Sequence, residues 1–246
     1  FFLNTKEAPF NNPLAREAVN YAIDRRALQR LDSGMLDPGC FFLPVGMPGH
    51  PSAKCPYGEP SAAPNLTKAK ELVKQSGLTG VPVTVWGGSR PPHKEFVDYY
   101  ASVLNAIGFK ATEKIVADAQ YYETIGNLSN KAQTGWVSFS QDFPNPIDFY
   151  QLLDAHSILP TENHNPSQVN DPHIQSELES LAPTPSSQLD TVVSRWQALD
   201  EYTAQKAYMA VFGYDEVPKF FSDRVDFGAA IFHPVYGNDW STLELK

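Results

Sequence analysis

The sequence has little of what would indicate a metal centre or an enzyme active site. It contains two cysteines and six histidines in 246 residues. The cysteines lack C-x-x-C spacing and no histidines cluster beside them, which argues against a zinc site. No G-x-S-x-G, H-E-x-x-H, phosphate-loop or dinucleotide-binding motif is present. We therefore predict a protein that is not an enzyme and that needs no metal or cofactor.

Long apolar runs and positive charge are also scarce. No run approaches the ~18 apolar residues that a membrane-spanning helix requires, so we predict no such helix. The chain has 19 Lys and Arg against 28 Asp and Glu, a net charge of -9, which argues against a nucleic-acid partner. No internal repeat is visible, which disfavours an adhesion or scaffolding module.

The most informative stretch is residues 135–150, where a strand, a turn and a helix start follow one another. Residues Trp136 to Phe139 are β-formers and predict a buried strand that ends near Asp142. The two prolines of Phe143 to Pro146 end the strand because proline has no N–H, and Asn145 fits the cap of a following helix. Asp142 and several aromatic residues are thus expected at a strand's carboxyl end, where open α/β sheets place ligands.

Strands and helices alternate through the middle of the chain. The pattern predicts, in order, a helix from about Asn65 to Ser76, a strand from Val81 to Trp86, a helix from about Lys94 to Ile107, a strand from Phe109 to Val116 and a short helix near Ala119 to Ile125. Such alternation implies parallel strand pairing with right-handed crossovers. The predicted fold class is α/β, with a parallel-rich sheet flanked by helices.

The flanking segments give further predictions. Arg16 and Arg25 follow the helix start at Pro13 and, as charges on an amphipathic helix, are expected to be solvated or structurally paired. Three later elements are predicted: the helix after Pro146 running to about Asp154, a helix from about Ser187 to Lys206, and a strand from Tyr208 to Phe212. Trp196 lies on an apolar helical stripe and is assigned to the core.

Residues 32–64 form a loop rich in proline and glycine that is longer than an ordinary connector. Cys40 and Cys55 lie in this loop. A disulfide between them would suit an exported protein and would contribute about 3 kcal/mol to stability, whereas two reduced, buried cysteines are the alternative. The loop itself is either a flap packed on the surface or a ligand contact.

The segment containing Phe139 and Asp142 resembles the W-x-x-D-[YF]-x-x-P segment of the extracellular solute-binding proteins of ABC transporters, in the dipeptide, oligopeptide and nickel group. Other segments resemble the same family: Phe2-Leu3-Asn4-Thr5, Pro9-Phe10, Arg16 to Arg25, Ala69 to Val73 with Gly77, and Asp239 to Leu243. The resemblance covers nearly the whole chain, but only the C-terminal half of the family. The chain also opens inside an apolar run without Met, so we expect that an N-terminal part has been removed.

The resemblance implies one lobe of a periplasmic-binding-protein-like type II fold. Residues 1–5 would be a hinge or crossing strand, 6–211 the α/β lobe, and 212–246 a β tail that returns to the other lobe. Asn4 and Tyr214 are the hinge candidates. A tail left loose would expose Phe220, Phe221 and Phe232.

The resemblance also implies a function. The protein would bind a peptide or similar small solute in a cleft between two lobes and deliver it to the transmembrane permease subunits of an ABC importer. It would act as a monomer outside the cytoplasm, in the periplasm or as a lipoprotein anchored at the outer face of the cell membrane. The fragment alone is expected to bind ligand weakly or not at all.

Candidate ligand-binding residues follow from the same resemblance. Asp142 would pair with a ligand ammonium group and Phe139 would line the pocket, with Ser140 and Trp136 of the same segment as further candidates. Gly88 is a candidate for another reason, because its loop follows the strand Val81 to Trp86 and lies at the same carboxyl edge as Asp142. In the alternative interpretation Asp142 only caps the turn and Phe139 only packs the core. Extended geometry would place Trp136 on the opposite side of the strand from Phe139.

Two other functions are weighed against a peptide receptor. Gln141 stands where small residues are usual in relatives, which leaves open a non-peptide solute such as a nickel chelate or a sugar. A hydrolase using Asp142 with Asp148 is the rival of another class. Asp148 is explained by its place near a helix N-terminus, and nothing in the sequence supplies a site for a distorted sugar.

Overall fold

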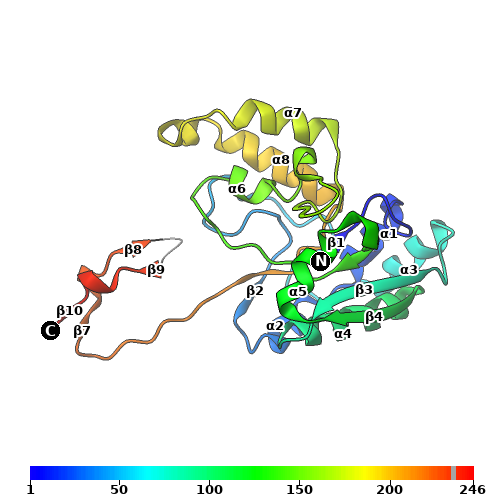
Figure 1. Ribbon diagram of the computed structural model, residues 1–246, viewed down its shortest axis with the longest axis horizontal. Helices are drawn as coiled ribbons and strands as arrows, with labels where there is room; N and C mark the ends of the chain where they lie inside the picture. Colours follow the sequence, from blue (N-terminus) through cyan, green and yellow to red (C-terminus); the bar gives the residue numbers. More distant parts are fainter. Residues whose placement is uncertain (234–236) are drawn as a thin grey trace.

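The computed structural model describes residues 1–233 and 237–246, and it contains a small sheet, two clusters of helices and an extended C-terminal segment (Figure 1). The strands of the sheet are β1 (Phe2–Leu3), β3 (Pro82–Gly88), β4 (Lys110–Val116) and β5 (Thr134–Gly135), in the order β1-β5-β3-β4. β3 pairs parallel with β4 and β5, and β1 pairs antiparallel with β5. The predicted parallel-rich α/β sheet is confirmed.

The first cluster of helices packs with this sheet. It consists of α1 (Pro13–Ala22), α2 (Arg25–Leu31), α3 (Leu66–Gln75), α4 (His93–Ile107) and α5 (Asp118–Ile125). α4 packs against β3 and β4, and α1 contacts α3 and α4. The buried side chains include Leu3, Val85 and Tyr100, and we call this group the sheet core.

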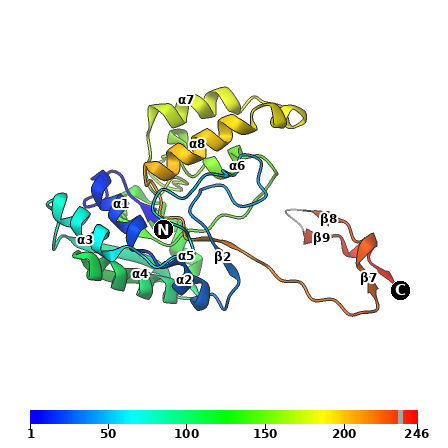
Figure 2. The same ribbon diagram turned by 180° about the vertical axis from the view of Figure 1, so that it is seen from behind.

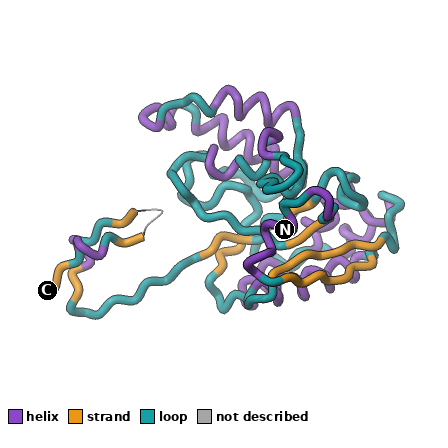
Figure 3. Tube along the Cα trace, viewed as in Figure 1, coloured by secondary structure: helices purple, strands orange, loops and turns teal. Residues whose placement is uncertain are grey.

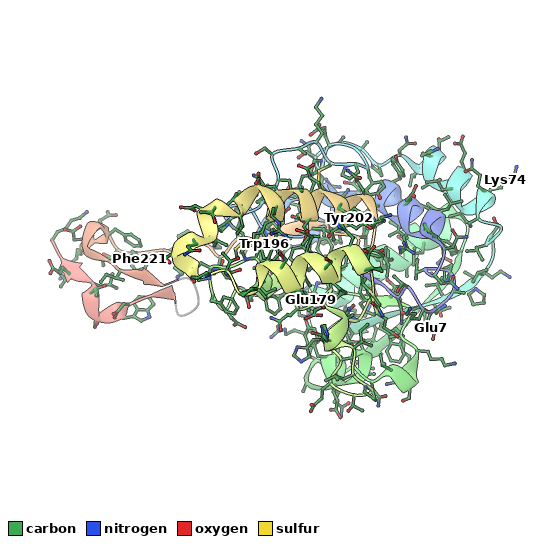
Figure 4. The ribbon with its side chains drawn as sticks, turned by 90° about the horizontal axis from the view of Figure 1, so that it is seen from above. Glu7, Lys74, Glu179, Trp196, Tyr202 and Phe221 are labelled. Atoms are coloured by element: carbon green, nitrogen blue, oxygen red, sulfur yellow. A yellow bond between two sulfur atoms is a disulfide. The ribbon has the colours of Figure 1, made fainter. Side chains whose placement is uncertain are left out.

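The second cluster forms its own core, which we call the helical core. Its helices are α6 (Ile147–Tyr150), α7 (Pro172–Leu181) and α8 (Val193–Gln205), and they lie at the end of the molecule opposite α2 and α4 (Figures 1 and 2). Trp196 of α8 is 0% exposed and packs with Ile174 of α7 and with Leu43 from the long loop, as Figure 4 helps to follow. The assignment of Trp196 to the core is confirmed.

Three predicted elements were wrong in extent. The helix expected to continue to Asp154 ends at Tyr150, because the next bonds, such as Leu153 N–H to the Tyr150 carbonyl, span only three residues. The helix expected over residues 187–206 is divided at Val192, whose φ of -120° separates a 3-10 helix, Ser186–Thr191, from α8.

The strand expected at Tyr208 to Phe212 lies further along the chain. The observed strand is β6 (Gly213–Asp215), which pairs antiparallel with β2 (Leu36–Pro38) from the long loop. Met209 makes only an isolated bridge to Phe2. The residues before β6 therefore run beside β1, and β6 itself pairs outside the main sheet.

Two side-chain attachments fix the long loop between α2 and α3. Cys40 and Cys55 form a disulfide with their Cα atoms 6.0 Å apart. The Asp200 carboxylate of α8 accepts hydrogen bonds from the backbone N–H groups of Phe42 (2.9 Å) and Leu43 (3.0 Å). Desolvation by burial raises the pKa of Asp200 to about 7, against the opposing effect of these hydrogen bonds.

Of the two expected states of Arg16 and Arg25, solvated or structurally paired, the structure shows the paired one, and both arginines are buried. Arg16 is 5% exposed and Arg25 4%. Each donates to backbone carbonyls, Arg25 Nε to Gly39 (2.8 Å) and Val211 (3.0 Å), and Arg16 to Phe10 (2.9 Å). Burial lowers the pKa of Arg25 to about 10. The guanidinium can be buried here because carbonyl oxygens accept its N–H groups.

The C-terminal segment extends away from both cores (Figures 1 and 3). It contains two antiparallel pairs, β7 (Val225–Asp226) with β10 (Glu244–Leu245) and β8 (Phe232–His233) with β9 (Gly237–Asn238).

Its apolar side chains are largely exposed. Phe220 is 91% exposed and Trp240 70%. Phe221 packs against Phe227 and Trp240 of the same segment and lies far from Trp196 (Figure 4). The predicted exposure of the Phe232 side chain lies outside what the structure describes. None of the helices within residues 1–233 and 237–246 is both long and apolar enough to span a membrane.

Replacing Arg25 with Met should destabilise the protein strongly, because two buried carbonyls would lose their donor. We expect the free energy of unfolding to fall by about 3 kcal/mol in chemical denaturation. The matched control is Arg26→Met, at an exposed neighbouring position, with a change within about 0.5 kcal/mol. Equal effects of the two substitutions would contradict the role of Arg25.

Asp200 should make stability depend on pH in a defined direction. Its pKa in the folded state, about 7, lies above the ordinary value of 3.8, so between these values only the folded state holds the extra proton. The free energy of unfolding should therefore fall as the pH rises from 4 to 7, by an amount on the order of 4 kcal/mol for this group.

The Asp200 effect is measured as a difference between denaturation curves of the wild type and Asp200→Asn from pH 4 to 7. The exposed Asp190→Asn serves as control and should follow the wild type. Parallel pH dependence of wild type and Asp200→Asn would exclude this linkage.

Candidate ligand-binding site

A cavity of about 360 Å³ lies between the carboxyl end of β5 and the segment from Met209 to Val217. Seven aromatic residues line it: Phe1, Phe42, Trp136, Phe139, Phe149, Phe212 and Tyr214. Ser140 and Gln141 add polar groups. A concave, mostly apolar site with a few polar groups is typical of small-ligand binding.

The segment after β5 lines this cavity because the strand is short, much shorter than predicted. β5 ends at Gly135, and Trp136 N–H makes the last bond to the sheet, to the Trp86 carbonyl (3.3 Å). The Trp136 carbonyl instead accepts the hydroxyl of Tyr121 (2.5 Å) from α5. The expected strand from Trp136 to Phe139 is therefore absent, and this segment is irregular.

The early end of β5 changes where the two aromatic candidates lie. Trp136 and Phe139 both line the cavity, but Trp136 belongs to the sheet core and Phe139 packs against the helical core. Trp136 is 7% exposed and stacks on His93, with ring centroids 3.7 Å apart. Phe139 is half-buried and packs edge-on against Phe149 at 5.3 Å. Phe139 thus has both a packing contact and a face on the cavity.

Asp142 lies at the rim and not in the cavity wall. Its side chain is exposed, and within the described residues its carboxylate has no hydrogen-bond partner. The turn is closed by the buried Asp148, whose Oδ2 accepts the backbone N–H groups of Asp142 (2.7 Å) and Phe143 (3.3 Å). Burial raises the pKa of Asp148, while these hydrogen bonds lower it.

The helix start after this turn also differs in detail. α6 begins at Ile147, whose N–H donates to the Asn145 side-chain oxygen (3.1 Å). Asn145 thus supplies the predicted capping oxygen. Asp148, expected to act on the helix N-terminus, instead orders the residues before it.

Gly88 and Asn4 lie outside the cavity wall. Gly88 pairs with Val116 at the end of β3, and a Cβ there would come within 2.0 Å of Asp118 Oδ1. Gly88 therefore permits the close approach of α5 to the sheet. Asn4 is 1% exposed and its amide donates to the Ala132 carbonyl (2.8 Å).

Tyr214, predicted as a hinge residue, lines the cavity. Its hydroxyl donates to the Phe41 carbonyl (3.0 Å). Its ring packs against the Gly39 backbone so closely that a Cβ on residue 39 would lie only 2.3 Å from the ring. Burial raises its pKa. Gly39 is therefore required for Tyr214 to take this position.

Several wall residues gave no signal in the sequence. Phe149, Phe212 and Asp215 reach the cavity from α6 and from the β6 region, and no local motif marks them. Asp215 is brought there by the pairing of β6 with β2, in which it lies opposite Leu36. Only a prediction of this long-range pairing would have identified it.

Comparisons with known proteins agree on one family. Residues 1–158 match the family model of the bacterial extracellular solute-binding proteins, family 5 Middle. The chain is 26% identical over 199 residues to the glutathione-binding protein GsiB of Salmonella paratyphi A. That alignment covers 72% of this chain and 37% of the relative.

Two solved structures have a similar fold. The clavulanic acid biosynthesis oligopeptide binding protein 2 superposes with a TM-score of 0.83 and 22% identity, over 99% of this chain and 45% of that one. A dipeptide binding protein from Pseudoalteromonas sp. SM9913, in complex with Met-Leu, gives a TM-score of 0.77 and 18% identity, over 100% of this chain and 47% of that one. The chain thus spans less than half the length of each of these relatives.

The turn at the cavity rim should depend on Asp148. In Asp148→Ala, the N–H groups of Asp142 and Phe143 lose their shared acceptor. We expect their amide hydrogen exchange, followed by NMR, to quicken about ten-fold or more, as for the loss of a hydrogen bond to a charged group. Asp190→Ala, at an exposed site, should leave both rates unchanged. Unaltered exchange in Asp148→Ala would rule out this role.

Proposed function

The chain belongs to family 5 of the bacterial extracellular solute-binding proteins, and from this membership we propose that it is part of the substrate-binding component of an ABC importer. The solute is a peptide or a similar small molecule. The observation that carries this proposal is the aromatic cavity of about 360 Å³ beside the end of β5, which includes Phe139 and Ser140 of the family-like segment. The glutathione and peptide ligands named for similar proteins support the same solute class.

Each candidate residue has a role in this proposal. Asp142 pairs with the ligand's ammonium group, for which its exposed carboxylate is available. Such charge-assisted hydrogen bonds contribute about 1.5–3 kcal/mol each. Phe139 and Trp136 provide apolar wall, and Ser140 provides a hydroxyl. Gly88 lies farther away and serves mainly the packing of Asp118.

We propose a two-lobe receptor in which this chain supplies most of one lobe. Residues 1–5 and the region of Tyr214 cross between lobes, with Asn4 and Tyr214 near the hinge, and 212–246 belong with the other lobe. The exposed Val217, Phe220 and Trp240 support this assignment, because such apolar side chains gain free energy by packing elsewhere. Closure of the lobes on the solute would couple binding to docking on the permease.

The proposed location is outside the cytoplasm. The family name describes extracellular proteins. The disulfide between Cys40 and Cys55 supports this location, since disulfides persist in oxidising compartments. The receptor would act there as a monomer that presents its solute to the permease subunits.

A non-peptide solute is the second candidate. Gln141 lines the cavity and adds a side-chain amide that can hydrogen-bond to a sugar or to the ligand of a metal chelate. For the hydrolase alternative, Asp148 is the obstacle, because its Oδ2 is already engaged by two backbone N–H groups. We therefore propose binding and not catalysis.

Calorimetry of the full-length protein with short peptides tests this function. Each peptide is supplied with a free amine and in N-acetylated form. We expect acetylation, or Asp142→Asn, to weaken binding about 10- to 100-fold, because a charge-assisted bond is lost. Asp190→Asn, at an exposed site, should bind as the wild type does. Absence of heat with either form of the peptide would redirect the proposal to a non-peptide solute.

A further inference from the structure

One charged side chain lines the cavity, and it is not Asp142. Among the described residues of the wall, Asp215 alone carries a charged side chain, while the others are aromatic, aliphatic or neutral polar groups. Within the described residues, its carboxylate has neither a hydrogen bond nor an ion pair. The cavity therefore presents an unpaired negative charge beside aromatic rings.

The surroundings of Asp215 favour a positive partner. His93 and the Asp32 carboxylate both interact with Asp215 electrostatically, and His93 stacks on the Trp136 ring and is itself half-buried. Burial lowers the pKa of His93, which disfavours its charged form as a counterion. Desolvation raises the pKa of Asp215, with His93 acting in the opposite direction. A cationic ligand would restore the charge balance that the protein leaves open.

The backbone that carries Asp215 is well fixed. Three residue pairs join β6 to β2, and the next residue, Glu216, donates its N–H to the Met35 carbonyl (2.8 Å). Just before β6, the Val211 carbonyl is held by Arg25. A carboxylate on a fixed backbone loses little conformational freedom when it binds a partner, which favours affinity.

The chemistry of this pocket defines its ligand group. A carboxylate attracts an ammonium or guanidinium ion, and aromatic faces attract the same cation while they accept an apolar stem. Both acids are exposed, but Asp215 lines the cavity whereas Asp142 does not.

We propose that Asp215 forms a second cation-binding subsite, which selects solutes that carry an ammonium or guanidinium group on an apolar stem. In a peptide, that group is a basic side chain, while the terminal ammonium goes to Asp142. This inference rests on the proposed function for the identity of the solute. It rests on the cavity alone for the preference for a cation.

The test compares two small probes that differ only in charge, 4-phenylbutylamine and 4-phenylbutanol. Binding to the full-length protein is followed by NMR chemical-shift titration. We expect the amine to bind at least about ten-fold more tightly than the alcohol, as for one charge-assisted contact. Asp215→Asn should remove this preference. Glu216→Gln loses the same charge at the next residue, outside the cavity wall, and should retain it.

A second titration separates this subsite from peptide binding. It uses Ala-Lys-Ala and Ala-norleucine-Ala, and Asp215→Asn should weaken only the lysine peptide, again about ten-fold. If the amine preference depends on Asp215 but no peptide binds, the peptide function fails and the subsite remains. If peptides bind and Asp215→Asn changes neither preference, the subsite is refuted and the function remains. Failure of both phenyl probes to bind also refutes the subsite.

Discussion

The buried guanidinium of Arg25 is the interaction on which the cavity depends. It donates to the carbonyls of Gly39, directly after β2, and Val211, shortly before β6. The Arg25 guanidinium is 4% exposed and must keep these partners, because a buried charge without partners would destabilise the fold by on the order of 3–5 kcal/mol. Arg25 thereby holds the two strands of the β2–β6 pair against the sheet core. Tyr214 and Asp215 receive their positions from that pair.

The cavity occurs where two separately packed cores meet. Trp136 and Phe212 belong to the sheet core, Phe149 belongs to the helical core, and Met209 packs against both. Aromatic residues of both cores line the space at their boundary. The Asp200 bonds to the long loop fix Phe42 on the same boundary. A ligand there would contact both cores at once.

Close contacts around Gly135 at the end of β5 precede the turn that places Asp142 at the cavity rim. A Cβ on Gly135 would lie 2.5 Å from the Trp86 carbonyl oxygen and 2.7 Å from the Tyr121 hydroxyl. Only glycine therefore allows β3 and the Tyr121 side chain to come this close to residue 135. The chain then leaves the sheet, and the turn closed by Asp148 directs Asp142 to the rim. Asp142 and Asp215 are both exposed, but only Asp215 is among the residues that line the aromatic cavity.

The sequence by itself determined the features that depend on neighbouring residues: the α/β alternation, the cap at Asn145, the core position of Trp196 and the family-like segment around Phe139. It misjudged the end of β5 and left open whether Arg25 is solvated or paired. Both features depend on distant partners, which are the Tyr121 hydroxyl for β5 and the carbonyls of Gly39 and Val211 for Arg25. Only the tertiary structure placed Asp215 in the cavity. Strand pairing between β2 and β6 joins residues far apart in the chain, and no local periodicity records that contact.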